Sequence, residues 1–306
     1  MGSRWLNLGI AALWLSTMSW LVVAKVLPPL VVGEPPSHQS VLEAQRHEPP
    51  VGWRVELNGR PVGWAVSRAV EAPNELSEVL SRVHFEGFSI DELAPRWLRG
   101  LVGADESPLG SISAEVENTL VLDPLGRPLS FDCSIRFDGL DEPVELEGTI
   151  NGPELELVVR SGTLRYRTTV AVPSGALMGS ALSPQSRLPG LRLGQRWTVP
   201  VYNPLRPRQP LEILQAQVVA SEPTVWLDRT VETWLVEYRK DAGAELASAG
   251  KPRGRLWVVK GGEAAGMVVR QETAFFDSTI LFERMATEDA ARLAEFPERK
   301  QDSPQP

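Results

Sequence analysis

Residues 144–168, VELEGTINGPELELVVRSGTLRYRT, decide the fold of this chain. They contain three short runs in which apolar and polar residues alternate, as on strands that bury one face. Asn151-Gly152 and Ser161-Gly162 separate the runs, and such pairs are typical of two-residue hairpin loops. The stretch therefore predicts an antiparallel meander.

The same two pairs also predict a register. If residues 151–152 and 161–162 form the loops, Leu157 faces Leu146 on one neighbouring strand and Tyr166 on the other. Apolar residues then share one face, so turn chemistry and alternation agree.

Similar runs occur on both sides of this stretch. Asn58-Gly59 predicts another hairpin, whereas residues 75–85 fit a strand or a helix. Short helices are predicted from Ser89, which begins a capping-box pattern, to Arg99, and from Ala286 to Phe296 with Thr287 as N-cap. The predicted class is all-β with minor α, in one large curved antiparallel sheet or two stacked sheets. Further strands are expected at 112–122, 129–137, 195–202, 213–220, 230–238, 255–260, 267–272 and 278–284.

The N-terminal segment from Trp5 to Ala24 contains no charged residue, and Arg4 precedes it. Its length suits a transmembrane helix, although a cleaved signal peptide is the alternative. With Arg4 inside, the segment predicts a single-pass protein of the cell membrane whose C-terminal domain is extracytoplasmic, in the periplasm. Either alternative implies export.

The chain divides by composition into four parts. Residues 1–32 are the anchor or signal, 33–50 a proline-rich linker, 51–286 the β domain, and 287–306 a C-terminal helix and disordered tail. Within the β domain, the apolar irregular segment from Pro173 to Gly194 is either a cap on the core or a lid over a groove.

Charge and motifs exclude several functions. After residue 32 the chain has 29 basic and 39 acidic side chains, which argues against nucleic-acid binding. The common catalytic and phosphate-binding motifs are absent, and His84 is the only histidine of the β domain. Cys133, the only cysteine, falls on the apolar side of a predicted strand. We therefore expect no enzyme activity, metal or cofactor.

Seven tryptophans lie outside the N-terminal segment. Large residues spread over many strands either build a core or line an apolar cleft. For the second alternative, the candidate ligand-binding residues are Trp64, Trp97, Trp197, Trp234 and Trp257.

Three motifs occur in a fixed order: WRVELNGRPVGW at 53–64, LPGLRLGQRWTVPV at 188–201 and GMVVRQE at 266–272. In this order they resemble uncharacterised exported bacterial proteins, some from planctomycete-like genomes, and the lipoprotein-carrier (LolA/LolB-like) superfamily. The resemblance implies a curved half-barrel whose concave apolar face holds lipid, and it implies no catalytic residue.

These observations favour a membrane-tethered, non-enzymatic module that binds a lipid, an acyl chain or a lipoprotein. The alternative is a structural or protein-interaction module of a cell-envelope complex, and a hydrolase of unknown type ranks third.

Overall fold

The computed structural model describes residues 2–23, 36–46, 48–88, 112–138, 141–173, 176–178, 184–202, 211–240, 251–275 and 278–294. The helices in these ranges include α1 (Gly2–Leu21), α3 (His38–Arg46) and α6 (Thr287–Leu293). The first strands are β1 (Val51–Leu57), β2 (Arg60–Glu71), β3 (Ser77–Phe88), β4 (Ile112–Leu122), β5 (Pro128–Phe137), β6 (Val144–Asn151), β7 (Glu154–Ser161) and β8 (Leu164–Ala171). They are followed by β9 (Leu177–Met178), β10 (Arg196–Tyr202), β11 (Leu211–Trp226), β12 (Arg229–Lys240), β13 (Gly254–Val259), β14 (Val268–Phe275) and β15 (Ser278–Arg284).

These strands form one sheet in the order β8-β7-β6-β5-β4-β3-β2-β1-β15-β14-β13-β12-β11-β10-β9. Every pairing is antiparallel except that of β9 with β10. The predicted all-β class is confirmed, and the sheet is one extended sheet rather than two. The ambiguous residues 75–85 belong largely to strand β3.

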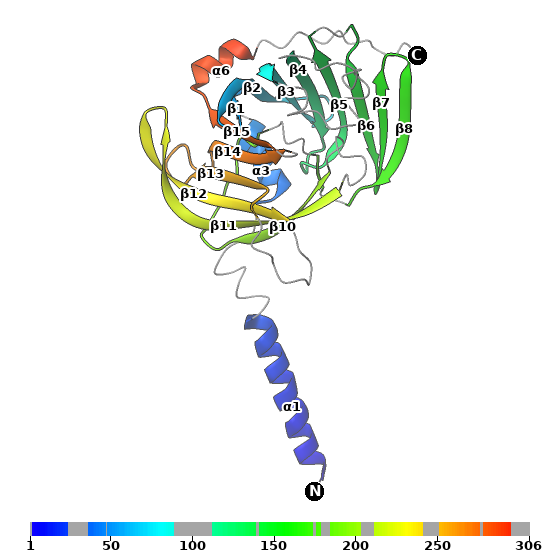
Figure 1. Ribbon diagram of the computed structural model, residues 1–306. Coiled ribbons are helices and arrows are strands. Elements are labelled where there is room, and N and C mark those ends of the chain that lie inside the picture. Colours follow the sequence, from blue (N-terminus) through cyan, green and yellow to red (C-terminus); the bar gives the residue numbers. More distant parts are fainter. Residues whose placement is uncertain are drawn as a thin grey trace.

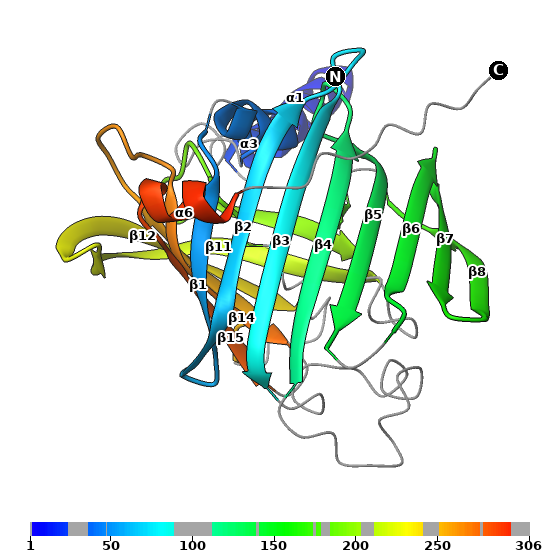
Figure 2. The ribbon, with the colours of Figure 1, turned by 90° about the horizontal axis from the view of Figure 1, so that it is seen from above.

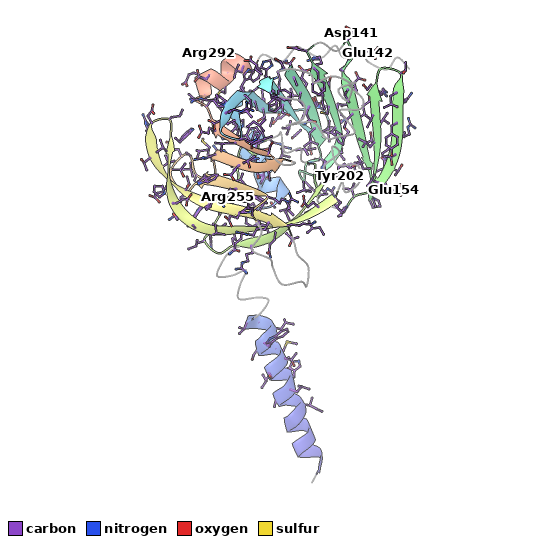
Figure 3. All side chains as sticks on the ribbon, viewed as in Figure 1. Asp141, Glu142, Glu154, Tyr202, Arg255 and Arg292 are labelled. Atoms are coloured by element: carbon purple, nitrogen blue, oxygen red, sulfur yellow. The ribbon has the colours of Figure 1, made fainter. Side chains whose placement is uncertain are left out.

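The sheet curls so that β1–β8 form one wall and β10–β15 the other (Figures 1 and 2). Both walls contribute fully buried residues to one continuous core, among them Trp53, Leu155 and Phe282. Burial raises the pKa of Tyr202 on β10, and the charge of Tyr166 on β8 adds to that shift. Figure 3 labels Tyr202 on the side where the two walls approach each other. The sheet therefore curls so that its two walls enclose one core.

The predicted meander is present, but its register differs by two residues. Leu157 pairs with Gly148 and Thr168 instead of Leu146 and Tyr166. The loops are residues 152–153 and 162–163, so each begins with its glycine, as a type II′ turn prefers. Because side chains alternate with a period of two, this shift keeps every residue on its predicted face. The hairpin predicted at Asn58-Gly59 is present, with Leu57 opposite Arg60.

Helix α1 projects away from the sheet (Figure 1), and its side chains from Ile10 onward are exposed. Of the helices in the described ranges, none combines the length and apolar character needed to cross a membrane. The predicted transmembrane helix is therefore not confirmed, and attachment to a membrane stays a prediction.

The proline-rich segment 33–50 is not simply the spacer that the sequence predicts. Helix α3 forms within it and packs on β2, with Leu42 only 2% exposed. Val41 packs against the core beside Leu42, and Arg46 Nε donates to Ser77 Oγ on β3. Burying the leucine alone contributes roughly 1.5–3 kcal/mol to this docking.

The C-terminal helix α6 ends at Leu293, and its N-cap is Ala286 rather than the predicted Thr287. It packs on β1 so closely that a Cβ at Gly52 would lie 2.8 Å from Ala290 Cβ. The predicted helix at 89–99 and the predicted tail after residue 294 lie outside the described residues.

Candidate functional site

A cavity lies on the inner face of the sheet beside strands β2, β3 and β4. Its volume is about 80 Å³. The chain after α3 and the segment that begins at Pro184 complete its wall. Apolar side chains contribute much of the lining: Val51, Ala65, Ala69, Val79, Val83 and Leu120. Polar groups come from Gln45, Glu48, Ser67, Arg68, Ser81, Asn118 and Ser186.

A buried ion cluster adjoins this cavity. The Glu48 carboxylate accepts hydrogen bonds at Oε1 from Arg187 Nε, at 2.6 Å, and from Arg284 Nη2, at 3.2 Å. The side chains of Glu48 and Arg284 are each 8% exposed. Arg284 Nη1 also donates to the carbonyl oxygens of Ser186, at 2.9 Å, and Val268. Burial lowers the pKa of Arg284, and the neighbouring Glu48 carboxylate opposes that shift.

The cluster joins three segments that are far apart in sequence. Glu48 follows α3, Arg187 lies in the segment before β10, and Arg284 ends β15. Removing charges from water is costly, so a buried cluster persists only where the charges are paired and hydrogen-bonded. We infer that the cluster fastens the chain around Glu48 and Ser186 to the end of strand β15.

One atom of the cluster remains without a partner. Glu48 Oε2 is buried and accepts no hydrogen bond from any described residue. A buried carboxylate oxygen without a donor costs roughly 1–3 kcal/mol or more. Glu48 also lines the cavity, so its carboxylate stands at the wall where the apolar side chains of β2, β3 and β4 meet the chain after α3.

The segment around residues 173–194 behaves as the predicted cap in its described parts. Ala176 and Leu188 belong to the buried core, with exposed fractions of 1% and 3%. The described residues of this segment therefore close the core.

The candidate tryptophans do not line one groove. Trp197 and Trp234 pack against the inner core, whereas Trp257 belongs to a small cluster on the outer face, with Val259 and Val269. Trp97 lies outside the described residues.

Trp64 also points away from the core. It stacks on His84, with 5.5 Å between ring centroids, and His84 Nε2 lies 2.9 Å from Glu86 Oε1. The Glu86 side chain is 71% exposed, so this histidine sits at the surface rather than in a cleft.

Chemistry typical of enzymes is not evident in the part of the chain that the structure describes. There, no group of three or more histidine, cysteine or acidic side chains is arranged to hold a metal ion. Burial, with a smaller contribution from the Asp132 charge, raises the pKa of Cys133 to about 12, so its thiol stays protonated. What the site offers is a small partly apolar cavity with one unsatisfied carboxylate oxygen.

Few features of the sequence indicate this site. Glu48 lies in the segment that composition predicts to be a linker, and Arg187 in an irregular segment. Arg284 could have indicated the ion cluster. It follows Ile280 and Phe282 on the apolar face of β15, and a charged side chain on a buried face requires a partner.

Comparisons with known proteins add little. No protein-family model matches this chain, and no curated protein is found to be related to it. Among solved structures, it is similar to a β-barrel-like protein of Brucella abortus with a domain of unknown function, DUF1849. The two are 11% identical, and the match covers 78% of this chain and 97% of that chain with a TM-score of 0.45. The resemblance to lipoprotein carriers stays a prediction.

Proposed function

We propose that this protein is a non-enzymatic binding module of the cell envelope, held at a membrane by its N-terminal segment. Its ligand is small and amphipathic: a short apolar body with a hydroxyl or amine that donates to Glu48. The observation that carries the proposal is the cavity on the inner face of the sheet, whose wall combines apolar side chains of β2, β3 and β4 with the Glu48 carboxylate.

The size of the cavity limits the ligand. A water molecule needs about 10–15 Å³ of such space, so about 80 Å³ holds several waters or a short ligand, but not a full-length acyl chain. Apolar side chains from β2, β3 and β4 suit the body of the ligand, because burying each CH₂ group contributes about 0.8 kcal/mol.

Attachment to a membrane is supported by the exposed apolar surface of α1. Leu13 is 70% exposed, and Ile10 and Trp14 are 58% and 59% exposed. A helix that shows apolar side chains on all sides is unfavourable in water and suits a lipid phase. The extracytoplasmic location follows from this segment and belongs to the same proposal.

Binding can be tested with short-chain alkanols, alkylamines and alkanoates, titrated calorimetrically into the full-length protein. We expect alkanols and alkylamines to bind more tightly than alkanoates, because a carboxylate would face the Glu48 oxygen with no proton to donate. Native mass spectrometry of the purified protein would show whether a ligand is retained from the cell.

A pair of variants tests whether the ligand binds in the cavity. Ala69→Leu adds three carbon atoms at the cavity wall, and we expect it to weaken binding at least about tenfold, the equivalent of roughly 1.4 kcal/mol. Val70→Leu is the matched control, since Val70 is the next residue on β2 and its side chain points to the other face. Equal binding by both variants, or a protein that binds none of the three series, would overturn the proposal.

A further inference from the structure

The outer face of β10–β12 carries exposed apolar side chains among arginines. Leu193, Ile213 and Val219 are 56%, 45% and 36% exposed. Arg196 is exposed on the same face. In the pairing of β10 with β11, Arg196 lies opposite Gln217, and Pro200 lies opposite Ile213. We call this surface the basic face; it consists of Arg192, Leu193, Arg196, Ile213, Val219 and Arg239.

The acidic side chains on this face are already paired. Glu237 is 12% exposed and accepts from Arg239, at 2.7 Å, and from Arg255, at 3.2 Å. Glu272 lies 3.7 Å from the same Arg255. The face is therefore positive on balance in spite of these carboxylates.

Charge is divided unequally between the two walls of the sheet. In residues 51–88, 112–138 and 141–173, which contain β1–β8, there are 9 basic and 16 acidic side chains. In residues 184–202, 211–240, 251–275 and 278–284, which contain β10–β15, there are 12 basic and 8 acidic ones. An anionic surface would attract the second wall and repel the first.

The basic face also lies on the side of the molecule from which α1 projects (Figure 1). Twelve residues, 24–35, join α1 to the chain before α3. At no more than about 3.5 Å each, they span about 40 Å at most. If α1 is held in a bilayer, the domain therefore stays within about 40 Å of the lipid headgroups, near enough for its charges to select which face approaches them.

We propose that the basic face rests on the anionic headgroups of the membrane that holds α1. Arginine guanidinium groups pair with lipid phosphates, and the exposed apolar side chains enter the boundary between headgroups and acyl chains. The acidic wall then faces away from the bilayer. This inference rests on the membrane attachment proposed above.

The test uses full-length protein with Cys133→Ser, incorporated into nanodiscs of phosphatidylcholine alone or with phosphatidylglycerol. A fluorophore is attached through Gln215→Cys, at an exposed position within the basic face, or through Thr169→Cys, an exposed position on β8. Lipids with a quencher on the headgroup report which label approaches the bilayer. We expect quenching at position 215 but not at 169, only with the anionic lipid, and weakened by high salt.

Replacing Arg192, Arg196 and Arg239 with glutamine provides the second measurement. Each substitution should lower the population of the docked orientation about fivefold. If the protein enters nanodiscs but position 215 is no more quenched than 169, or is quenched equally without anionic lipid, the inference is wrong and membrane attachment stands. If the protein does not enter nanodiscs at all, the attachment itself is wrong. Self-association through position 215, seen as crosslinking between copies, would also overturn the inference.

Discussion

The ion cluster around Glu48 allows a sharp prediction about stability. Glu48→Gln keeps the size of the side chain and removes its charge, so two guanidinium groups remain with no carboxylate between them. Arg284 is the more affected of the two, because its side chain is 8% exposed, against 21% for Arg187. Water therefore cannot replace the lost partner of Arg284.

Removing one partner of a buried ion pair typically costs about 3–5 kcal/mol. The glutamine oxygen can still accept one hydrogen bond, and Arg284 keeps the carbonyls of Ser186 and Val268, so we expect the lower end, about 3 kcal/mol. Proteins are stable by about 5–15 kcal/mol, so this loss is a large part of the total.

The assay is urea unfolding followed by tryptophan fluorescence, with the free energy of unfolding taken from the linear extrapolation. Glu43→Gln is the control, since Glu43 is exposed on α3, and we expect a change within about 0.5 kcal/mol. The double variant Glu48→Leu with Arg284→Met should recover most of the loss, because a buried pair replaced by apolar groups is often neutral. A loss below about 1 kcal/mol for Glu48→Gln would refute the view that the cluster fastens the chain after α3.

Two further predictions concern β5 and β6. The pKa of Cys133 is raised to about 12, so at pH 8 its thiolate fraction is about a thousandfold smaller than the ordinary pKa of 9.0 would give. Alkylation of Cys133 by iodoacetamide should therefore be slower by about that factor in the folded protein than in urea. In the folded protein the alkylation rate should keep rising above pH 10. Equal rates in both states would contradict this. Gly148→Val should lower stability by about 1–3 kcal/mol or more, because a Cβ there would lie 2.0 Å from the ring of Phe131; an unchanged urea midpoint would contradict the packing.

Much of the sheet could be predicted because local chemistry and burial agree along it. Alternation placed Leu146, Leu157 and Val159 on the buried face, and all three are buried. The register was wrong because Asn-Gly and Ser-Gly suggested turns centred one residue too early. A glycine can occupy the first or the second position of such a loop, and local sequence does not choose between them.

The length of β11 shows a second limit. The predicted strand ends at Ala220, three residues before Pro223, and a proline cannot donate a hydrogen bond to a neighbouring strand. The strand continues to Trp226, and Pro223 stands opposite Glu232, beyond a register shift between Val218 and Ala220. Here pairing with β12 prevails over the local preference.

The site was less predictable than the fold because it depends on contacts between distant segments. Glu48 and Arg284 are 236 residues apart, and neither stands in a recognisable motif. Composition predicts that residues 33–50 are a linker. Contacts with distant strands, such as those of the buried Leu42 and of the Glu48 carboxylate, instead attach the described residues 36–46 and 48–50 to the sheet.

The filled interior also decides what kind of ligand the sheet can take. A long acyl chain on the concave face would have to displace side chains such as Trp53, Phe282 and Tyr202, which are at most 1% exposed. Losing one such side chain from a core typically costs about 3–5 kcal/mol, and burying CH₂ groups at about 0.8 kcal/mol each repays that only after several of them. A short ligand in the existing cavity requires no such displacement.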